Sequence, residues 1–152
     1  MFRGVNEINL DAKGRMALPA KYRELIVEVC EGRMVVTIDT EERCLLLYPL
    51  AEWEQIEKKI ESLPSFNRAA RRIQRLLIGH ATDLEMDGNG RILISAPLRD
   101  YAELEKKVVL IGQGKKFEVW SEALWQEKRA EWLDECASGE GEISDELGSI
   151  SL

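Results

Sequence analysis

The sequence has few of the residues on which most catalytic and metal sites depend. It contains one histidine, His80, and three widely spaced cysteines, Cys30, Cys44 and Cys136, among 152 residues. It has no Cys-x-x-Cys pair and no phosphate-binding Gly-x-x-x-x-Gly-Lys-[Ser/Thr] motif. Structural zinc and the common nucleophilic mechanisms therefore lack a set of ligands or bases. We expect reduced thiols, no enzyme activity, no metal site and no cofactor.

Long apolar runs are also missing. Runs such as Leu45–Leu47 and Val108–Ile111 have three and four residues, whereas a membrane-spanning helix needs about 18 or more. The opening residues, Met1–Glu7, lack the apolar centre of a signal peptide. A composition of 45% apolar and 32% charged residues is typical of a soluble globular chain. These features predict a cytoplasmic protein with no membrane partner.

Positive charge is in the minority, with 21 Lys and Arg against 28 Asp and Glu. Six of the acids lie between Asp134 and Leu152, a segment that has no Lys or Arg. We expect the Gly-, Ser- and Glu-rich end of the chain, residues 138–152, to be a flexible acidic tail. Residues 1–133 carry 22 acids and 21 bases. This nearly balanced part can still bind nucleic acid through local basic clusters.

The chain contains two copies of one sequence unit, related by a shift of 76 residues. Leu10–Leu25 aligns with Met86–Tyr101 without a gap. The identical pairs are Asp11/Asp87, Gly14/Gly90, Arg15/Arg91, Ala20/Ala96 and Arg23/Arg99. Each copy is too small to close a core comfortably by itself, so the repeat predicts two units that share one core.

Each copy has the pattern of a ββαββ unit. An Asp-x-x-Gly-Arg turn separates two short apolar strands, and Asn89-Gly90 is typical of a two-residue hairpin turn. Later strands are expected at 34–39, 44–48, 108–112 and 116–120. Helices are expected at 21–30, 50–63, 68–78, 98–106 and 123–137. Trp53 and Trp125 are expected in the core or at an interface.

The Asp-x-x-Gly-Arg turn has a structural and a functional interpretation. In the structural one, Asp accepts backbone N–H bonds, Gly supplies a positive φ and Arg pairs with Asp. That leaves unexplained why four bases and one acid lie between Asp11 and Arg23. A basic two-stranded ribbon fits the DNA major groove, where Arg binds guanine and Lys neutralises phosphate. Only two bases and one acid lie between Asp87 and Arg99, so we expect the first copy to contribute more affinity.

Several motifs in combination resemble the MraZ family of bacterial transcriptional regulators. They are the opening Met1–Gly4, the paired turns, Cys44–Pro49 and Arg71–His80. The resemblance covers residues 1–133 and implies a β-rich α+β fold of two tandem AbrB/SpoVT-like ββαββ swapped-hairpin modules, which share a pseudo-two-fold core. It also implies a nucleoid-associated ring of identical subunits. The ring would bind direct repeats of a short G-rich box, and so repress the chain's own gene and the adjacent division and cell wall gene cluster.

Individual residues have expected roles, and each segment of the chain has expected boundaries. Arg15 is expected to contact a base, with Arg3, Lys13, Lys21 and Arg91 as further DNA-binding residues. For Arg91, pairing with Asp87 is an equally good interpretation. The turn residues are Asp11, Gly14, Asp87, Asn89 and Gly90. The expected parts are two modules at 5–52 and 81–124, a helical connector at 53–80, a helix at 125–137 and the tail.

Other interpretations remain for the chain and for its central helix. The chain could be an oligomeric scaffold without specific DNA binding, an antitoxin-type AbrB protein or, least in keeping with its residues, an enzyme. Arg71, Arg72 and Arg75 could form a solvated helix face or contact an acidic partner subunit. At helical spacing, Arg71 and Arg75 are expected to face the same way. His80, after Gly79, is expected to close a helix end.

Overall fold

The computed structural model describes residues 1–139 and 144–151. They form two compact units, Met1–Glu122 and Ala123–Leu152. The first repeat supplies β1 (Phe2–Asn9), β2 (Arg15–Ala17), α1 (Ala20–Cys30), β3 (Arg33–Ile38) and β4 (Leu45–Pro49). The segment between the strands of the two repeats supplies α2 (Leu50–Glu61), α3 (Arg68–Ile73) and the π-helical turn η1 (Gln74–Ile78). The second repeat supplies β5 (Thr82–Glu85), β6 (Arg91–Leu93), α4 (Ala96–Tyr101), β7 (Lys107–Gly114) and β8 (Phe117–Ser121).

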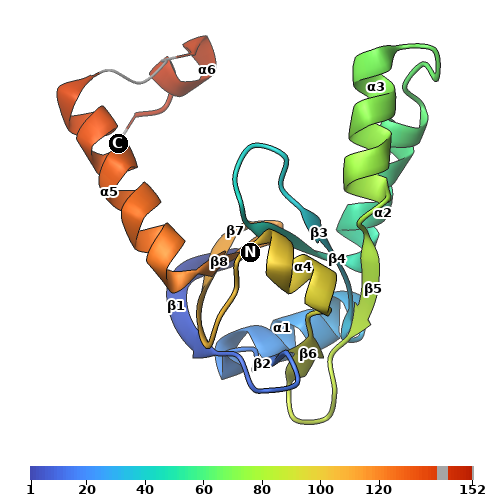
Figure 1. Ribbon diagram of the computed structural model, residues 1–152, viewed down its shortest axis with the longest axis vertical. Coiled ribbons are helices and arrows are strands. Elements are labelled where there is room, and N and C mark those ends of the chain that lie inside the picture. The colour runs from blue at the N-terminus through green and yellow to red at the C-terminus, as the bar shows by residue number, and fades with distance from the viewer. Residues whose placement is uncertain (140–143, 152) are drawn as a thin grey trace. The chain divides into compact units, whose positions relative to one another are not determined.

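The two repeats build one sheet by exchanging strands (Figure 1). The six-stranded order is β1-β7-β8-β4-β3-β5, and every pairing is antiparallel. Each repeat gives its first strand to the other, because β1 pairs with β7 and β5 pairs with β3. The strands β1, β3 and β4 of the first repeat correspond to β5, β7 and β8 of the second. Exchanging each strand for its counterpart gives the same strand order read from the opposite edge of the sheet, which is the mark of a pseudo-two-fold axis. The predicted fold of two swapped-hairpin modules around a shared pseudo-two-fold core is confirmed.

The strands beside each Asp-x-x-Gly-Arg turn do not form a hairpin with each other. In the first repeat a single bridge, Leu10 to Met16, crosses the turn. Instead β2 pairs with β6 in a separate two-stranded ribbon, with Met16 opposite Ile92. The local hairpin suggested by Asn89-Gly90 is therefore wrong in its pairing. Short strands gain more from apolar partners in the other repeat, where both Met16 and Ile92 are buried.

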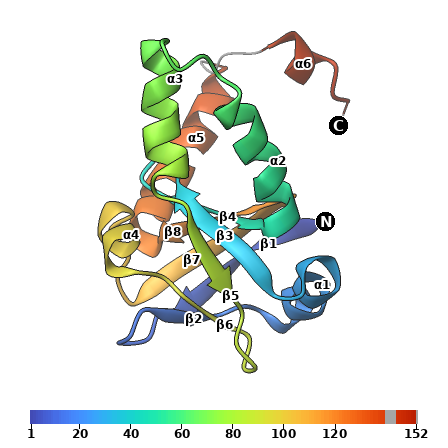
Figure 2. The same cartoon turned by 90° about the vertical axis from the view of Figure 1, so that its right-hand side faces the viewer.

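Alternating side chains of the sheet build a separate apolar cluster on each face. Met34 and Val36 of β3 belong to the main core, which also contains side chains of α1, α4 and the ribbon. Val35, one residue out of phase, packs with Tyr48 and Trp53 in a second cluster beneath α2 and η1. Trp53 is 3% exposed, so its predicted packing role is confirmed. Figure 2 shows α2 and α3 rising from the sheet side by side.

Local sequence signals locate the helices well but not all of their ends. Asn67 caps α3 as predicted, since its side chain accepts a hydrogen bond from the Ala70 N–H. The second-repeat helix ends at Tyr101, earlier than the expected 106. The connector helix changes to π geometry at Gln74, which periodicity did not predict.

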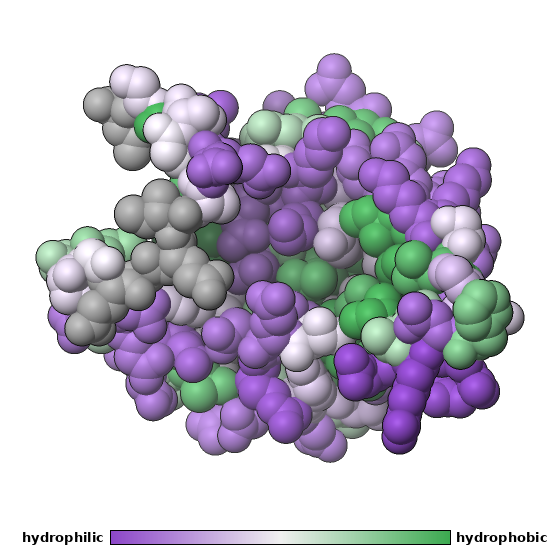
Figure 3. Space-filling model, turned by 90° about the horizontal axis from the view of Figure 1, so that it is seen from above, coloured by the Kyte–Doolittle hydropathy of each residue, from purple (hydrophilic) through white to green (hydrophobic). Residues whose placement is uncertain are grey.

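Apolar side chains gather among hydrophilic ones over the α2 and α3 region at the right of Figure 3.

The second unit contains α5 (Glu122–Ser138), whose first residue closes the first unit, and α6 (Asp145–Gly148). Within α5 the rings of Trp125 and Trp132 lie 6.1 Å apart, centre to centre. Part of the predicted flexible tail, residues 140–143 and 152, lies outside the described residues. None of the helices that the structure describes is long and apolar enough to cross a membrane.

Candidate nucleic-acid interface

The first turn is closed by the carboxylate of Asp11. One oxygen, Oδ1, accepts the backbone N–H groups of Lys13 and Arg15, both at 2.9 Å. The other, Oδ2, accepts the Nε–H of Arg15 at 2.8 Å. Gly14 has φ +87°, a left-handed conformation that glycine adopts without steric cost. The turn thus holds the Arg15 side chain beside Asp11 at an exposed tip.

The second turn repeats this geometry. Asp87 Oδ1 accepts the backbone N–H groups of Asn89 and Arg91, both at 2.9 Å. Asp87 Oδ2 accepts Nε–H of Arg91 at 3.1 Å, and Gly90 has φ +74°. The Asp–Arg pairing considered for Arg91 is therefore present in both turns. It uses one edge of each guanidinium, which has five N–H donors in total.

Hydrogen bonding keeps both aspartates ionised. The backbone N–H of Arg15 is the largest cause that lowers the pKa of Asp11, and the Arg15 side chain contributes. The pKa of Asp87 is lowered in the same way, chiefly by the backbone N–H of Arg91. Near neutral pH each carboxylate can therefore organise its turn as a permanent acceptor.

Each turn is held in place by the other repeat. The Leu18 N–H donates to the Gly90 carbonyl oxygen at 2.8 Å, and the Ile94 N–H donates to the Gly14 carbonyl oxygen at 2.9 Å. Arg23 Nε donates to the Leu18 carbonyl oxygen at 2.7 Å. A Cβ built on Gly90 would lie only 2.2 Å from that Nε. The two tips are therefore the ends of one ribbon, and backbone hydrogen bonds tie each tip to the other repeat.

Arg23 and Arg99 are positioning residues that sequence reasoning did not assign. Arg99 Nε and Cζ would lie 2.9 and 3.0 Å from a Cβ on Gly14, so Arg99 braces the first turn as Arg23 braces the second. Arg99 Nε is buried and has no hydrogen-bond acceptor among the described residues. The sequence did contain a signal for this role, because both repeats have arginine at this position, Arg23 and Arg99, 76 residues apart.

The predicted basic residues divide into two groups. Lys13, Arg15 and Arg91 lie in or next to the turns. Lys21 and Arg3 instead meet at Tyr22, whose hydroxyl donates to the Arg3 carbonyl oxygen while the Lys21 ammonium lies 4.9 Å from its ring centre. From Arg3 to the end of β1 at Asn9 the strand covers about 20 Å. Arg3 and Lys21 therefore form a second basic point away from the tips.

The connector contributes a third basic feature. Arg68, Arg72 and Arg75 line one shallow groove together with Leu76, whereas the expected partner of Arg75, Arg71, is not among its lining residues. His80 follows this helix, and its Nδ1 lies 2.7 Å from the Leu76 carbonyl oxygen. This contact satisfies a carbonyl group of the final helical turn, as expected of a residue that closes a helix end.

Among the described residues, one group could in principle hold a metal ion. Oxygen atoms of Asp39 and Glu118 and the sulfur of Cys44 lie within 4.8 Å of one another. Burial, followed by the nearby charge of Glu118, raises the pKa of the Cys44 thiol far above its ordinary value. The protonated thiol donates to Asp39 Oδ2 at 3.6 Å. Because a metal-binding cysteine must be a thiolate, this arrangement favours a hydrogen-bonded thiol.

The strand exchange and the paired turns define a duplicated swapped-hairpin protein. The MraZ protein family model, described as antitoxin-like, matches residues 1–76 and again 77–138. The chain is similar to proteins named transcriptional regulator MraZ from Legionella pneumophila and Coxiella burnetii, each 57% identical over 152 residues. The namesake from Halorhodospira halophila is 56% identical, and all three alignments cover both chains completely. The chain belongs to the MraZ family, whose relatives here are named as regulators and not as enzymes.

Proposed function

We propose that this chain is a transcriptional regulator that binds duplex DNA through its paired turns. The observation that carries the proposal is the anchoring of Arg15 and Arg91 by Nε on an aspartate, at two exposed tips of one ribbon. Anchoring at Nε leaves the terminal nitrogens as donors. Two such donors match the O6 and N7 acceptors of guanine in the major groove.

The remaining basic residues have roles that follow from their positions. Lys13 lies beside Arg15 in the first turn and suits a phosphate contact, whereas Asn89 replaces it in the second. Arg3 and Lys21 form a separate exposed cluster, which suits the flanking backbone. Phosphate contacts give affinity and orientation, and base contacts give specificity. The first turn is thus assigned more of the affinity.

The wider proposal follows from the family. The chain represses its own gene and the adjacent division and cell wall gene cluster by binding direct repeats in the promoter. It acts as a ring of identical subunits in the cytoplasm, associated with the nucleoid. The names of its relatives support regulation. Residues 5–52 and 81–124 are the modules, 53–80 the connector, 125–137 a helix and 138–152 an acidic tail. Linking several weak turn contacts raises affinity through effective concentration.

Binding to a duplex from the chain's own upstream region, against a scrambled duplex, tests the proposal. We expect preference for the upstream duplex, weakening steeply as salt rises. Arg15→Ala should lose this preference, while Lys59→Ala, which removes an exposed charge on α2, should keep it. Oligomers that show no preference at any salt concentration would support the scaffold interpretation instead.

A further inference from the structure

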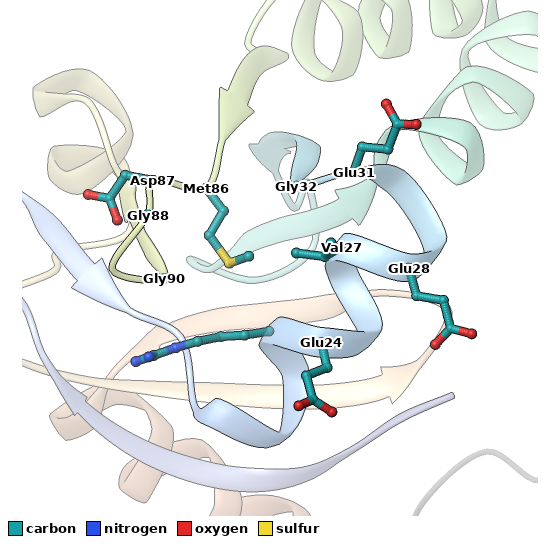
Figure 4. Close-up of a pocket in the computed structure, with 10 residues that line it drawn as sticks. Glu24, Val27, Glu28, Glu31, Gly32, Met86, Asp87, Gly88 and Gly90 are labelled. Atoms are coloured by element: carbon teal, nitrogen blue, oxygen red, sulfur yellow. The ribbon is translucent and has the colours of Figure 1, made fainter.

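A groove of about 540 Å³ lies between helix α1 and the second turn (Figure 4). Val27, which is 54% exposed, and Met86 supply its apolar surface. Three exposed carboxylates line it from α1 and its end, Glu24, Glu28 and Glu31. Asp87 lines it from the second turn, and Arg23 is the one base among its lining residues. The groove therefore combines a row of negative charge with exposed apolar area, a composition suited to a basic amphipathic helix.

The corresponding groove beside the first turn differs in charge. It is lined by Arg99 and Lys106 as well as Glu105 and Asp11. Opposite signs therefore meet at the first-turn groove, whereas beside the second turn carboxylates dominate. The excess of carboxylates makes the second groove less suited to phosphate than the first. The acidic groove accordingly suits a protein partner better than the DNA assigned to the turns.

The same chain carries a surface of complementary charge and spacing. Arg68, Arg72 and Arg75 line a groove of about 460 Å³ with Leu76. These arginines are separated by four and three residues, as are Glu24, Glu28 and Glu31. Glu24 and Glu28 lie one helical turn apart on α1, and Arg68 and Arg72 lie one helical turn apart on α3. Two arginines can thus meet two carboxylates at matching helical spacing while Leu76 contacts the apolar surface.

We propose that the acidic groove of one subunit binds the arginine-lined surface of α3 and η1 of a second copy of this chain. This inference rests on the ring oligomer of the proposed function and identifies the two surfaces that join its subunits. In Figure 2, α1 and α3 lie at opposite ends of the first unit. The contact therefore joins unlike surfaces and leaves one of each kind free, so that subunits add head to tail until a ring closes.

Charge reversal in the full-length chain tests the contact. Glu24→Arg/Glu28→Arg makes the groove basic, and Arg68→Glu/Arg72→Glu makes the helix surface acidic. Each variant alone places like charges together and should elute as a monomer in size-exclusion chromatography with light scattering. The matched controls are Glu54→Arg/Glu61→Arg on α2 and Arg71→Glu, next to Arg72 but outside its groove. Both controls should keep the wild-type mass.

Restoring the oligomer by compensating charge reversals shows that these two surfaces contact each other. Combining all four reversals in one chain re-forms each pair with its signs exchanged, so the oligomer should return. Mixing the two double variants should give an alternating oligomer with an even number of subunits, because each basic surface then meets an acidic one. Circular dichroism identical to wild type ensures that a monomeric variant is folded.

The outcomes separate this inference from the wider function. If wild type is oligomeric and both double variants stay oligomeric, or if neither combination restores assembly, another surface joins the subunits and the inference is wrong. A wild-type monomer overturns the ring and this contact together but leaves DNA recognition by the turns intact. An oligomer lost and restored as described, without any DNA preference in wild type, supports the contact and contradicts the regulator.

Discussion

Replacing Gly90 by alanine tests whether the two repeats hold each other's turns. Gly90 has φ +74°, and an added Cβ would lie 2.2 Å from Nε and 2.5 Å from Cδ of Arg23. A left-handed conformation costs a residue with a Cβ about 1–2 kcal/mol. Displacing Arg23 also removes its hydrogen bond to the Leu18 carbonyl oxygen, worth about 0.5–1.5 kcal/mol. We expect Gly90→Ala to lower the free energy of unfolding by about 1.5–3.5 kcal/mol.

Gly88 offers a matched control in the same turn. A Cβ there meets nothing within 4 Å, and its φ is not in the left-handed region. Gly88→Ala should therefore change stability by less than about 0.5 kcal/mol. Urea unfolding at one fixed protein concentration measures both variants, because assembly adds to apparent stability. With an m-value of about 2 kcal/mol per molar urea, the Gly90→Ala midpoint should fall by about 0.8–1.8 M.

Coupling to Arg23 distinguishes the two contributions. In an Arg23→Ala background, Gly90→Ala should cost only the backbone part, about 1–2 kcal/mol. Equal midpoints for Gly90→Ala and Gly88→Ala would refute the reasoning, because neither the positive φ nor the close approach of Arg23 would then affect folding.

Three further predictions concern acid stability, thiol reactivity and the second core cluster. The pKa of Asp11 is lowered in the folded protein, so the ionised carboxylate stabilises the fold at pH values above its unfolded pKa, near 3.9. This stabilisation is lost as pH falls through the folded pKa. In urea unfolding, the Asp11→Asn variant should therefore lose less stability on acidification than wild type. The buried Cys44 thiol, whose pKa is raised, should resist iodoacetamide in the native protein at pH about 8 while exposed Cys136 reacts; equal labelling by mass spectrometry would contradict this. The protonated Cys44 thiol contributes to folding stability below the unfolded thiol pKa, near 8.5, and this contribution is lost as pH rises further. Trp53→Ala should cost about 3–5 kcal/mol in urea unfolding because it empties a site beneath α2; a loss below 1 kcal/mol would show that the cluster is not a packed core.

Sequence patterns predicted most elements because their signals are local. The expected helix at 21–30 is observed as Ala20–Cys30, and the expected strand at 44–48 as Leu45–Pro49. The internal repeat predicted two units and one core. Periodicity alone could not show which strands pair, because β1 and β7 lie about a hundred residues apart and join through backbone hydrogen bonds, which every strand can form and which leave no mark in the sequence.

The candidate site was predicted in part. The Asp–Arg pairing and the positive φ of Gly14 and Gly90 follow from turn chemistry and are confirmed. The separation of Lys21 from the tips was not predictable, because it depends on how α1 leaves the ribbon. The bracing role of Arg23 was missed for a related reason, since its close approach to Gly90 of the other repeat follows from strand exchange.

Recognition of DNA by the first turn is tested most directly by comparing Arg15→Ala with Lys13→Ala on the upstream and scrambled duplexes across a salt series. Arg15 is assigned to a base, so its loss should remove about 1–3 kcal/mol of discrimination per subunit contact. Lys13 is assigned to phosphate, so its loss should weaken binding to both duplexes equally and lower the salt slope by about one per contact. If both variants retain wild-type affinity and discrimination, the first turn does not read DNA and the account is wrong.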